Sequence, residues 1–191
     1  AVHELLGRRV ALKMLSGSRV RGEQAVSRFH REARAAAAIE SPHVVEVFDY
    51  GTDEDDAPFL VMELLNGEDL ARRLSREPQL GVARTIQIAR QACEALAAAH
   101  ARGIVHRDIK PENLFLCERT GDDEHVKVLD FGIARIDRSA DAPTVTTTGS
   151  IQGTPRYLAP EQIEGLAVDG RADLYGLAVV IYRALAGFEP F

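Results

Sequence analysis

The stretch His106-Arg107-Asp108-Ile109-Lys110-Pro111-Glu112-Asn113 decides how this chain is interpreted. Its eight residues combine acidic, basic and amide side chains with a proline. A run with apolar residues at helical spacing precedes the stretch, and the strand-like Leu114-Phe115-Leu116 follows it. Because catalytic groups are often carried by rigid loops between ordered elements, this stretch is a candidate active-site loop.

Two further motifs lie on either side of this loop. Asp130-Phe131-Gly132 begins seventeen residues after Asn113, and Val10-Ala11-Leu12-Lys13 lies upstream. Three motifs in this order are far more specific than any one alone. The chain resembles a protein kinase, and in particular the bacterial eukaryotic-like (Hanks-type) serine/threonine kinases. The resemblance covers essentially all 191 residues, and no G-x-x-x-x-G-K-[ST] motif supports a competing nucleotide-binding fold.

The composition fits this class of protein. Hydrophobic residues make up 46% of the chain and charged residues 27%, as in an ordinary globular protein. The formal net charge of −6 argues against a general nucleic-acid binder, whose surface would be basic. Cys93 and Cys117 stand apart without a CxxC motif, which favours reduced thiols over a disulfide framework or a zinc site.

The chain carries no sign of a leader or a membrane segment. No charged and then apolar stretch opens it, and the most apolar run, from Leu174 to Leu185, contains Arg183 and is too short to span a bilayer. We therefore expect a cytoplasmic kinase domain, with any membrane anchor elsewhere in a longer parent protein. Because the chain begins at Ala1 without a methionine and ends at Phe191 in the middle of a sequence rather than after a helix, we expect it to be a fragment.

The N-terminal part is predicted to combine a strand and a helix. Alternating apolar residues predict a strand over 9–15, in which Lys13 faces away from Leu12. A helix is predicted over 23–39, and Glu32 lies on its apolar stripe. From the residues alone, Lys13 could be a solvated lysine on an edge strand and Glu32 a partly exposed acid. That stripe consists of Val26, Phe29, Ala33, Ala36 and Ala37.

Further elements follow from hydrophobic periodicity and turn residues. Strands are predicted over 44–51, 58–63 and 126–129, and helices over 68–74, 82–102 and 173–186. The expected buried stripes are Ile86, Ala89, Cys93, Leu96 and His100 in the second of these helices, and Leu174, Leu177, Ala178, Ile181 and Leu185 in the third. We expect His100 to be a packed or rim histidine and not a ligand.

The resemblance implies roles for the residues of the central loop. Asp108 would orient the substrate hydroxyl or accept its proton, and Lys110 would neutralise charge on the transferred phosphate. Asn113 and Asp130 are oxygen ligands suited to Mg²⁺, with Mn²⁺ as a second candidate ion. In this family, a lysine at the place of Lys110 accompanies specificity for serine and threonine, so protein Ser/Thr hydroxyls are the expected substrate.

The resemblance also implies how ATP is held. Lys13 would bind the α- and β-phosphates, and Glu32 would orient it through an ion pair. Around the adenine, Met62 would be the gatekeeper and residues 63–65 the hinge. The cofactor-binding residues expected beside Lys13 and Glu32 are therefore Ala11, Met62, Glu63, Leu65 and Phe115.

A regulatory site is expected from the residues after Asp130. Arg107 directly precedes Asp108, and kinases with an arginine there commonly use it to grip a phosphate on the activation loop. Thr146 and Thr148 are the expected acceptors of that phosphate, although threonines are also simply common in exposed loops. Autophosphorylation would bring two copies of the protein together. Thr154 is expected to take part in substrate docking.

The predicted fold is a two-lobed α+β protein-kinase-like fold, truncated at both ends, without the Gly-rich loop and the C-terminal helices. Residues 1–65 would form a partial small lobe and residues 66–191 a partial large lobe. The predicted function is ATP-dependent phosphoryl transfer to Ser/Thr hydroxyls of proteins in bacterial signalling. Two alternatives stay open, a catalytically inert kinase fragment and a pseudokinase-like binding module.

Overall fold

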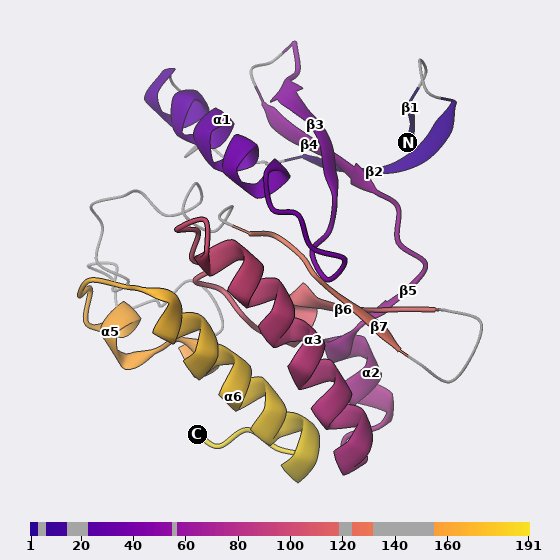
Figure 1. Cartoon of the computed structure of the whole chain (residues 1–191), viewed down its shortest axis with the longest axis vertical. Coiled ribbons are helices and arrows are strands. Elements are labelled where there is room, and N and C mark those ends of the chain that lie inside the picture. The colour runs from indigo at the N-terminus through magenta and orange to yellow at the C-terminus, as the bar shows by residue number, and fades with distance from the viewer. Residues whose placement is uncertain (4–6, 15–22, 55–56, 119–123, 132–154) are drawn as a thin grey trace.

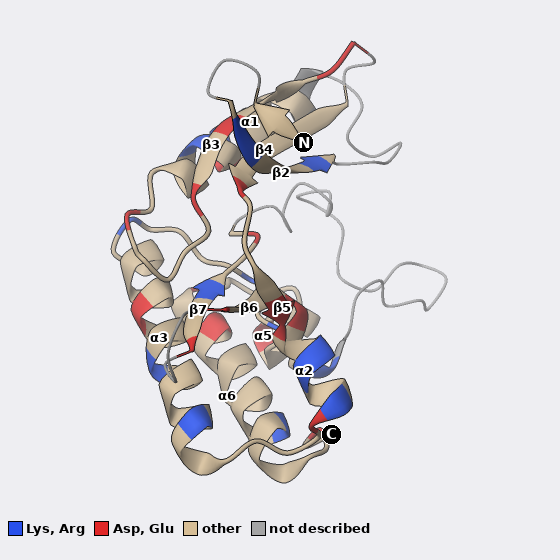
Figure 2. Ribbon diagram, turned by 90° about the vertical axis from the view of Figure 1, so that its right-hand side faces the viewer, with Lys and Arg blue, Asp and Glu red and all other residues tan. Residues whose placement is uncertain are grey.

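The protein contains two β-sheets and a set of helices, as the computed structural model in Figure 1 shows. The structure describes residues 1–3, 7–14, 23–54, 57–118, 124–131 and 155–191. One sheet has four strands in the order β1-β2-β4-β3, and the other has three in the order β5-β6-β7. In both Figure 1 and Figure 2, the four-stranded sheet and α1 lie together at one end of the molecule, and α2, α3 and α6 lie at the other.

The four-stranded sheet is antiparallel throughout its described pairs. Its strands are β1 (Val2–His3), β2 (Arg8–Met14), β3 (Val47–Thr52) and β4 (Pro58–Glu63). The register places Ala11 opposite Met62 and Lys13 opposite Leu60. Since side chains alternate between the two faces of a strand, Ala11 and Lys13 share one face of β2. The strand predicted over 9–15 is thereby confirmed to within one residue at each end.

Helix α1 (Glu23–Ala37) packs on this sheet through a small apolar core. Phe29 and Ala33 from the helix meet Leu60 from β4, and all three are almost fully buried. Phe29 also makes an edge-on contact with Tyr50 of β3, at 6.2 Å between ring centroids. The predicted stripe was wrong at Ala37, the last residue of the helix, which is exposed.

The second sheet and the helices form the larger core of the molecule. The strands are β5 (Gly67–Asp69), β6 (Leu114–Cys117) and β7 (His125–Val128). The helices are α2 (Leu70–Arg76), α3 (Val82–His100), α5 (Pro160–Ile163) and α6 (Gly170–Ala186), with 3₁₀ turns η2 (Pro111–Asn113) and η3 (Pro155–Tyr157). Helix α3 packs against both α6 and β7 and is the centre of this part.

Several element boundaries differ from the sequence prediction, among them the end of α1 at Ala37, the end of α3 at His100 and the start of α6 at Gly170. The strand predicted over 44–51 begins at Val47, and Val44 instead forms an isolated bridge to Val128 in the other sheet. The helix predicted over 68–74 begins at Leu70, because residues 67–69 pair with β6 and Asp69 caps the helix by accepting from Arg72 N–H at 2.8 Å. The lobe boundary between residues 65 and 66 stays a prediction.

The buried faces of α3 and α6 were predicted only in part, since Leu96 and Leu177 are buried as expected. Five other residues of the expected stripes are exposed, namely Ile86 (61%), Leu174 (49%), Cys93, Ala178 and Leu185. The buried face of α3 consists of Thr85, Ile88, Gln91, Ala92, Ala95, Leu96 and Ala99, and that of α6 of Ala172, Asp173, Gly176, Leu177, Val179, Val180 and Ala184. Several residues of both faces are small, which lets neighbouring segments approach the helices closely.

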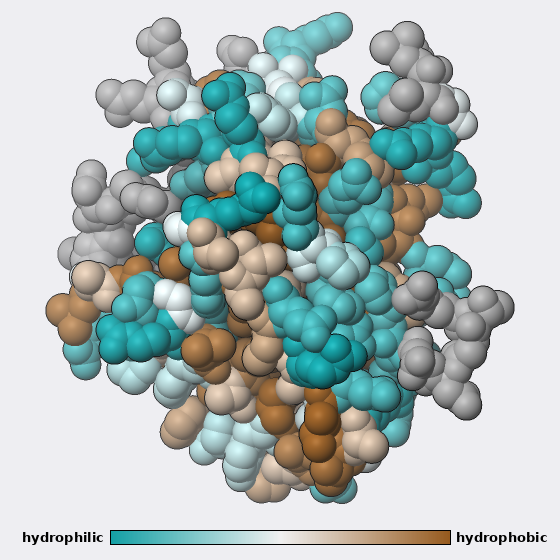
Figure 3. Space-filling model, in the orientation of Figure 1, coloured by the Kyte–Doolittle hydropathy of each residue, from teal (hydrophilic) through white to brown (hydrophobic). Residues whose placement is uncertain are grey.

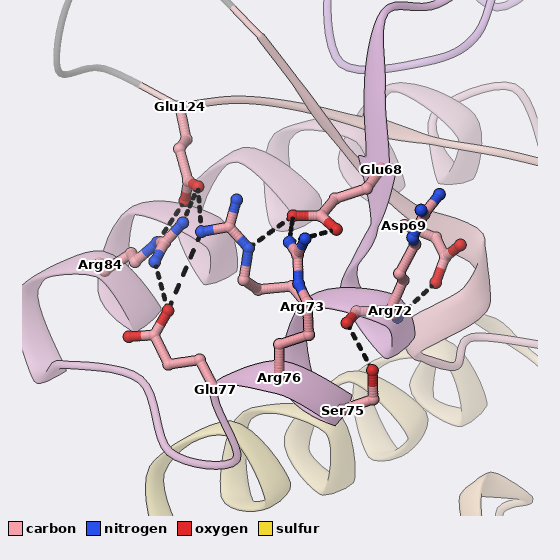
Figure 4. Close-up of polar contacts among 9 residues, drawn as sticks. All are labelled: Glu68, Asp69, Arg72, Arg73, Ser75, Arg76, Glu77, Arg84 and Glu124. Carbon is pink, nitrogen blue, oxygen red and sulfur yellow. Dashed lines mark hydrogen bonds and ion pairs between the residues drawn. The ribbon is translucent and has the colours of Figure 1, made fainter.

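Charged side chains tie α2 to its neighbours, as Figure 4 shows. Glu68 accepts hydrogen bonds from Arg73 Nε and Arg76 Nη2, each at 2.6 Å. Arg84 at the start of α3 binds both Glu77, at 3.0 Å, and Glu124 before β7. This charged network, defined by Glu68, Arg73, Arg76, Glu77, Arg84 and Glu124, connects β5, α2, α3 and the segment leading into β7.

Apolar side chains also reach the surface. In the space-filling view of Figure 3 they gather at the lower edge, over the end of α6 and the start of α3. Exposed large residues of these segments are Val82, Ile86, Tyr182, Leu185 and Phe188. Within the part of the chain that the structure describes, no helix has the length and apolar character needed to cross a bilayer.

Candidate active site

The loop that joins α3 to β6 gathers three of the predicted catalytic side chains. Lys110 Nζ lies 2.7 Å from Asp108 Oδ2. Asn113 is 5% exposed, and its amide nitrogen donates to the backbone carbonyl of Asp108 at 2.7 Å and to Asp108 Oδ2 at 3.3 Å. The carboxylate of Asp108 keeps about a quarter of its side chain exposed. It is therefore held in place from two sides and is still open to a substrate.

Asp130 and Lys13 meet beside this loop. Lys13 Nζ on β2 lies 2.5 Å from Asp130 Oδ2, and both side chains are partly exposed. The residue before Asp130 is linked to the loop as well, since Leu129 N–H donates to the carbonyl of Asn113 at 2.9 Å. The chain thus places an amine from the four-stranded sheet, a carboxylate after β7 and the Asp108 loop at one site.

The buried side chain of His106 connects the Asp108 loop to the segment that leads to Asp130. It is fully buried, its Nε2 donates to the carbonyl of Leu129 at 2.6 Å, and its Nδ1 accepts from Asp108 N–H at 3.2 Å. These contacts suit a neutral imidazole with its proton on Nε2. The ring also meets Phe131 edge-on, at 4.8 Å between centroids. His106 is therefore a structural link between the Asp108 loop and the Asp130 segment.

Asp173 on α6 supports the loop, and the sequence analysis did not identify it. Its side chain has no exposed surface, and its two oxygens accept from the backbone N–H groups of His106 at 2.9 Å and Arg107 at 2.7 Å. His100 Nε2 lies 2.7 Å from the same carboxylate. His100 is thus a packed histidine, as the sequence analysis expected, and Asp173 is its partner. The sequence did contain one signal for Asp173, because it is an acidic residue among the apolar residues of the helix predicted over 173–186.

Two residues of the site have unusual backbone conformations. Arg107 and Asp130 have φ of 67° and 64°, in the left-handed region that non-glycine residues rarely adopt. Such conformations typically cost about 1–3 kcal/mol each and persist where surrounding contacts impose them. Here Asp173 holds the N–H of Arg107, and Lys13 pairs with the carboxylate of Asp130. Non-glycine residues in this region often mark functional sites.

The residues predicted to surround ATP lie on neighbouring strands. Ala11 and Met62 are opposite one another on β2 and β4, on the sheet that carries Lys13, and both are partly buried. Leu65 follows β4, and Phe115 lies on β6 opposite Lys127. Their contact with a nucleotide stays a prediction.

Glu63 is held by its side chain. Its Oε1 lies 2.5 Å from Lys127 Nζ and accepts from Glu46 N–H at 2.8 Å. The same lysine donates to the carbonyl of Val44 at 3.2 Å. The end of β4, where the hinge is predicted, is therefore tied to β7, the strand that leads to Asp130. Sequence reasoning did not find Lys127, because a lone lysine in a strand gives no signal of its partner.

Glu32 lies on α1 and lines a cavity of about 300 Å³ together with Arg31, His106 and Arg107. Lys13 forms an ion pair with Asp130. The orientation of Lys13 by Glu32 stays a prediction. Gly132, Thr146, Thr148 and Thr154 lie outside the described residues, so the expected regulatory and docking roles stay predictions as well.

The donor atoms fit a magnesium ion that also binds phosphates. Mg²⁺ prefers oxygen ligands and is commonly bound by one or two protein groups together with substrate phosphates. Asp130 offers a carboxylate, and the amide nitrogen of Asn113 is engaged by Asp108, which leaves its Oδ1 as the ligand atom. Among the described residues, no cluster of three or more His, Cys, Asp and Glu side chains could hold a metal by itself.

Comparison with known proteins decides the family. Residues 1–191 match the family described as protein kinase domain. The chain belongs to the protein kinase family. This membership confirms the resemblance drawn from the three sequence motifs.

Individual kinases support the same assignment. The chain is 44% identical over 183 residues to the serine/threonine-protein kinase pkn3 of Myxococcus xanthus, and 42% identical over 195 residues to PknA of Mycobacterium tuberculosis. Among solved structures, the PknI kinase domain of M. tuberculosis matches with a TM-score of 0.74 and 32% identity. The predicted kinase-like fold is thereby confirmed.

These matches cover most of this chain but only part of its relatives. The alignments include 95% of this chain with pkn3, 100% with PknA and 95% with the PknI domain. They span 34% of pkn3, 44% of PknA and 65% of the solved PknI chain.

Proposed function

We propose that this chain is the catalytic part of a bacterial-type serine/threonine protein kinase, which transfers the γ-phosphoryl group of ATP to Ser/Thr hydroxyls of proteins. The observation that carries the proposal is the convergence of Asp108, Lys110 and Asn113 with the Lys13–Asp130 ion pair. Phosphoryl transfer needs mainly an aligned hydroxyl, a nearby base and cations around the migrating charge. Asp108 supplies the base and can align the hydroxyl, and Lys13 and Lys110 supply positive charge. Asn113 and Asp130 supply oxygen ligands for a metal cation.

Asp108 is the group placed to act on the substrate hydroxyl. Its carboxylate is partly exposed and fixed by Asn113 and Lys110, so it can orient the hydroxyl and accept its proton. Lys110 lies within 2.7 Å of that carboxylate and adds a positive charge where the transferred phosphate would lie. A lysine there agrees with a serine/threonine substrate.

The nucleotide would lie against β2 and the Asp130 segment. Lys13 would exchange its contact with Asp130 for the α- and β-phosphates, and Asp130 with Asn113 Oδ1 would hold the cation. Mg²⁺, or Mn²⁺ in its place, neutralises the phosphate charge when it is bound. The partly buried Ala11, Met62 and Phe115 would flank the adenine, and the backbone of residues 63–65 would bind its edge.

The proposal extends to the binding partners and the cellular location of the protein. Protein substrates carrying serine or threonine are expected, together with a second copy of the kinase during autophosphorylation. Because ATP is the proposed substrate, we expect the reaction to take place in the cytoplasm. A pseudokinase-like module is the second candidate, and it would bind Mg-ATP without transferring phosphate.

Phosphate transfer by the wild-type protein separates these two functions, and a single substitution tests the role of Asp108. In the longest natural form of the protein that contains this chain, Asp108→Asn should lower phosphate transfer to a Ser/Thr-containing protein by about 10²–10⁴-fold, the range of general-base catalysis. Mg-ATP affinity, measured by calorimetry, should stay close to that of the wild type. Glu54→Gln makes the same carboxylate-to-amide change at an exposed turn and should keep full activity. Wild-type protein that binds Mg-ATP but transfers no phosphate would support the binding module instead.

A further inference from the structure

Arg107, the residue before the proposed base, is held at both ends of its backbone. Its φ of 67° is unfavourable for arginine, so contacts from elsewhere must maintain it. On one side its N–H donates to Asp173 of α6 at 2.7 Å. On the other side its carbonyl accepts from Gln162 Nε2 of α5 at 2.8 Å, across 55 positions of sequence. This carbonyl belongs to the peptide unit that leads directly into Asp108.

Gln162 uses the two ends of its amide for different purposes. It is 8% exposed, and its Oε1 accepts from the N–H of Ala159 at 3.1 Å, at the start of α5. Its Nε2 is the donor to Arg107. A glutamine meets both demands because one atom accepts and the other donates. A glutamate could keep the contact with Ala159 but has no N–H to offer the carbonyl of Arg107.

A purely structural role for Gln162 predicts something different. If the side chain only capped the four-residue helix α5, the acceptor Oε1 would be the part that matters. The donor bond to Arg107 would then be incidental. The bond, however, reaches the one residue of the catalytic loop whose backbone is strained, and its sequence neighbour is the partly exposed carboxylate of Asp108.

We propose that Gln162 is a positioning residue for phosphoryl transfer, which acts through the Arg107 peptide to fix the direction of Asp108. The inference rests on the proposed kinase function. Gln162 follows Thr154, which is expected to take part in substrate docking, by eight positions of sequence. The Arg107–Gln162 bond therefore links the base to the part of the chain that follows this residue. Its loss should disturb the chemical step more than the binding of ATP.

A second buried glutamine provides a matched control. Gln91 on α3 is 5% exposed, its Nε2 donates to the carbonyl of Glu124 at 2.8 Å, and its Oε1 accepts from Val126 N–H at 2.8 Å. It makes the same two kinds of backbone contact as Gln162, but with β7 and the residue before it. Gln91→Leu should lower stability and leave the Asp108 loop as it is.

The test compares Gln162→Leu, Gln162→Glu and Gln91→Leu in the longest natural form of the protein. Displacement of a catalytic group by about 1 Å can cost about 10²-fold in rate, so both Gln162 variants should lower kcat by roughly 10- to 100-fold. The KM for ATP should change by no more than about twofold, because the lost interaction acts on the chemical step. Hydrogen–deuterium exchange at residues 106–109 should rise in both Gln162 variants and stay unchanged in Gln91→Leu.

The outcomes separate this inference from the proposed function. If Gln162→Glu keeps wild-type kcat and exchange, Gln162 only caps α5 and the inference fails while the kinase function holds. An equal loss of kcat per folded molecule in Gln91→Leu would also overturn it, since general packing would then explain the effect. Absence of phosphate transfer by the wild type would overturn the kinase function. Even then, unchanged hydrogen–deuterium exchange at residues 106–109 in the Gln162 variants would show that Gln162 does not position the Asp108 loop.

Discussion

The amino group of Lys13 lies 2.5 Å from Oδ2 of Asp130, although 117 positions of sequence separate the two residues. Lys13 belongs to the four-stranded sheet, and Asp130 follows β7 of the other sheet. The contact therefore joins the two parts of the molecule at the place where the nucleotide phosphates are proposed to bind. In this structure the charges of Lys13 and Asp130 neutralise each other. When nucleotide and metal bind, Lys13 would contact the phosphates and Asp130 the cation.

The first prediction removes the amine. Lys13→Met should weaken Mg-ATP binding by about tenfold to 100-fold, because a hydrogen bond to a charged group contributes about 1.5–3 kcal/mol. Calorimetric titration measures the affinity directly. Lys13→Arg keeps the positive charge and should bind Mg-ATP more tightly than Lys13→Met. If Lys13→Met binds like the wild type, Lys13 does not hold the phosphates.

The sequence was sufficient for the parts of the site that lie in contiguous motifs. Asp108, Lys110 and Asn113 stand within six residues of one another, so a short loop had to bring them together. The strand of Lys13 and the helix of Glu32 were also predictable, because their periodicities are clear. These predictions needed no knowledge of how distant segments pack.

The sequence was insufficient where a side chain serves a distant backbone. Asp173 and Gln162 bind the N–H and the carbonyl of Arg107, and a backbone group has no side-chain signature. The buried faces of α3 and α6 were predicted only in part, because small buried residues such as Ala95 and Gly176 give little hydrophobic signal. Gly176 faces the loop that carries Ile109, which its position on the helix could not reveal. A methyl group on Gly176 would lie 3.0 Å from the carbonyl of Ile109.

The second prediction concerns control by phosphorylation. Thr146 and Thr148 lie outside the described residues, but Arg107 lines the cavity next to α1 and can bind a phosphate through its planar guanidinium. We expect autophosphorylation at these threonines, and a several-fold loss of activity in the double variant Thr146→Ala, Thr148→Ala. Mass spectrometry of wild-type protein and of the Asp108→Asn variant tests it. Phosphate found only outside residues 138–154, or a fully active double variant, would contradict this switch.

The third prediction concerns the ion pair behind the predicted hinge. Lys127→Met removes the cation next to Glu63, whose side chain is only 22% exposed, and should lower the free energy of unfolding by about 1–3 kcal/mol. Urea unfolding measures this change. Glu63→Gln combined with Lys127→Met should recover part of the loss, because no carboxylate is then left without its partner. Strictly additive effects of the two substitutions would show that the pair is not coupled.

The last prediction uses the pH dependence of Glu68. The hydrogen bond from Arg73 holds the pKa of this carboxyl below its ordinary range, and the positive charge of Arg76 acts in the same direction. A carboxyl with a lower pKa in the folded state stabilises that state above its unfolded-state pKa, near 4.3. The stabilisation is lost as the pH falls through the folded-state pKa. Glu68→Gln should therefore cost up to about 1 kcal/mol at pH 7, as is typical of ion pairs near the surface.

The same comparison in acid gives the decisive measurement for Glu68. The difference in unfolding free energy between wild type and Glu68→Gln should shrink as the pH is lowered below about 4, because the wild-type carboxyl then becomes neutral as well. Urea unfolding of both proteins at several pH values follows this difference. Glu164→Gln, at an exposed position, should show little difference at any pH. A difference that stays constant or grows in acid would mean that Glu68 contributes by packing and not by its charge.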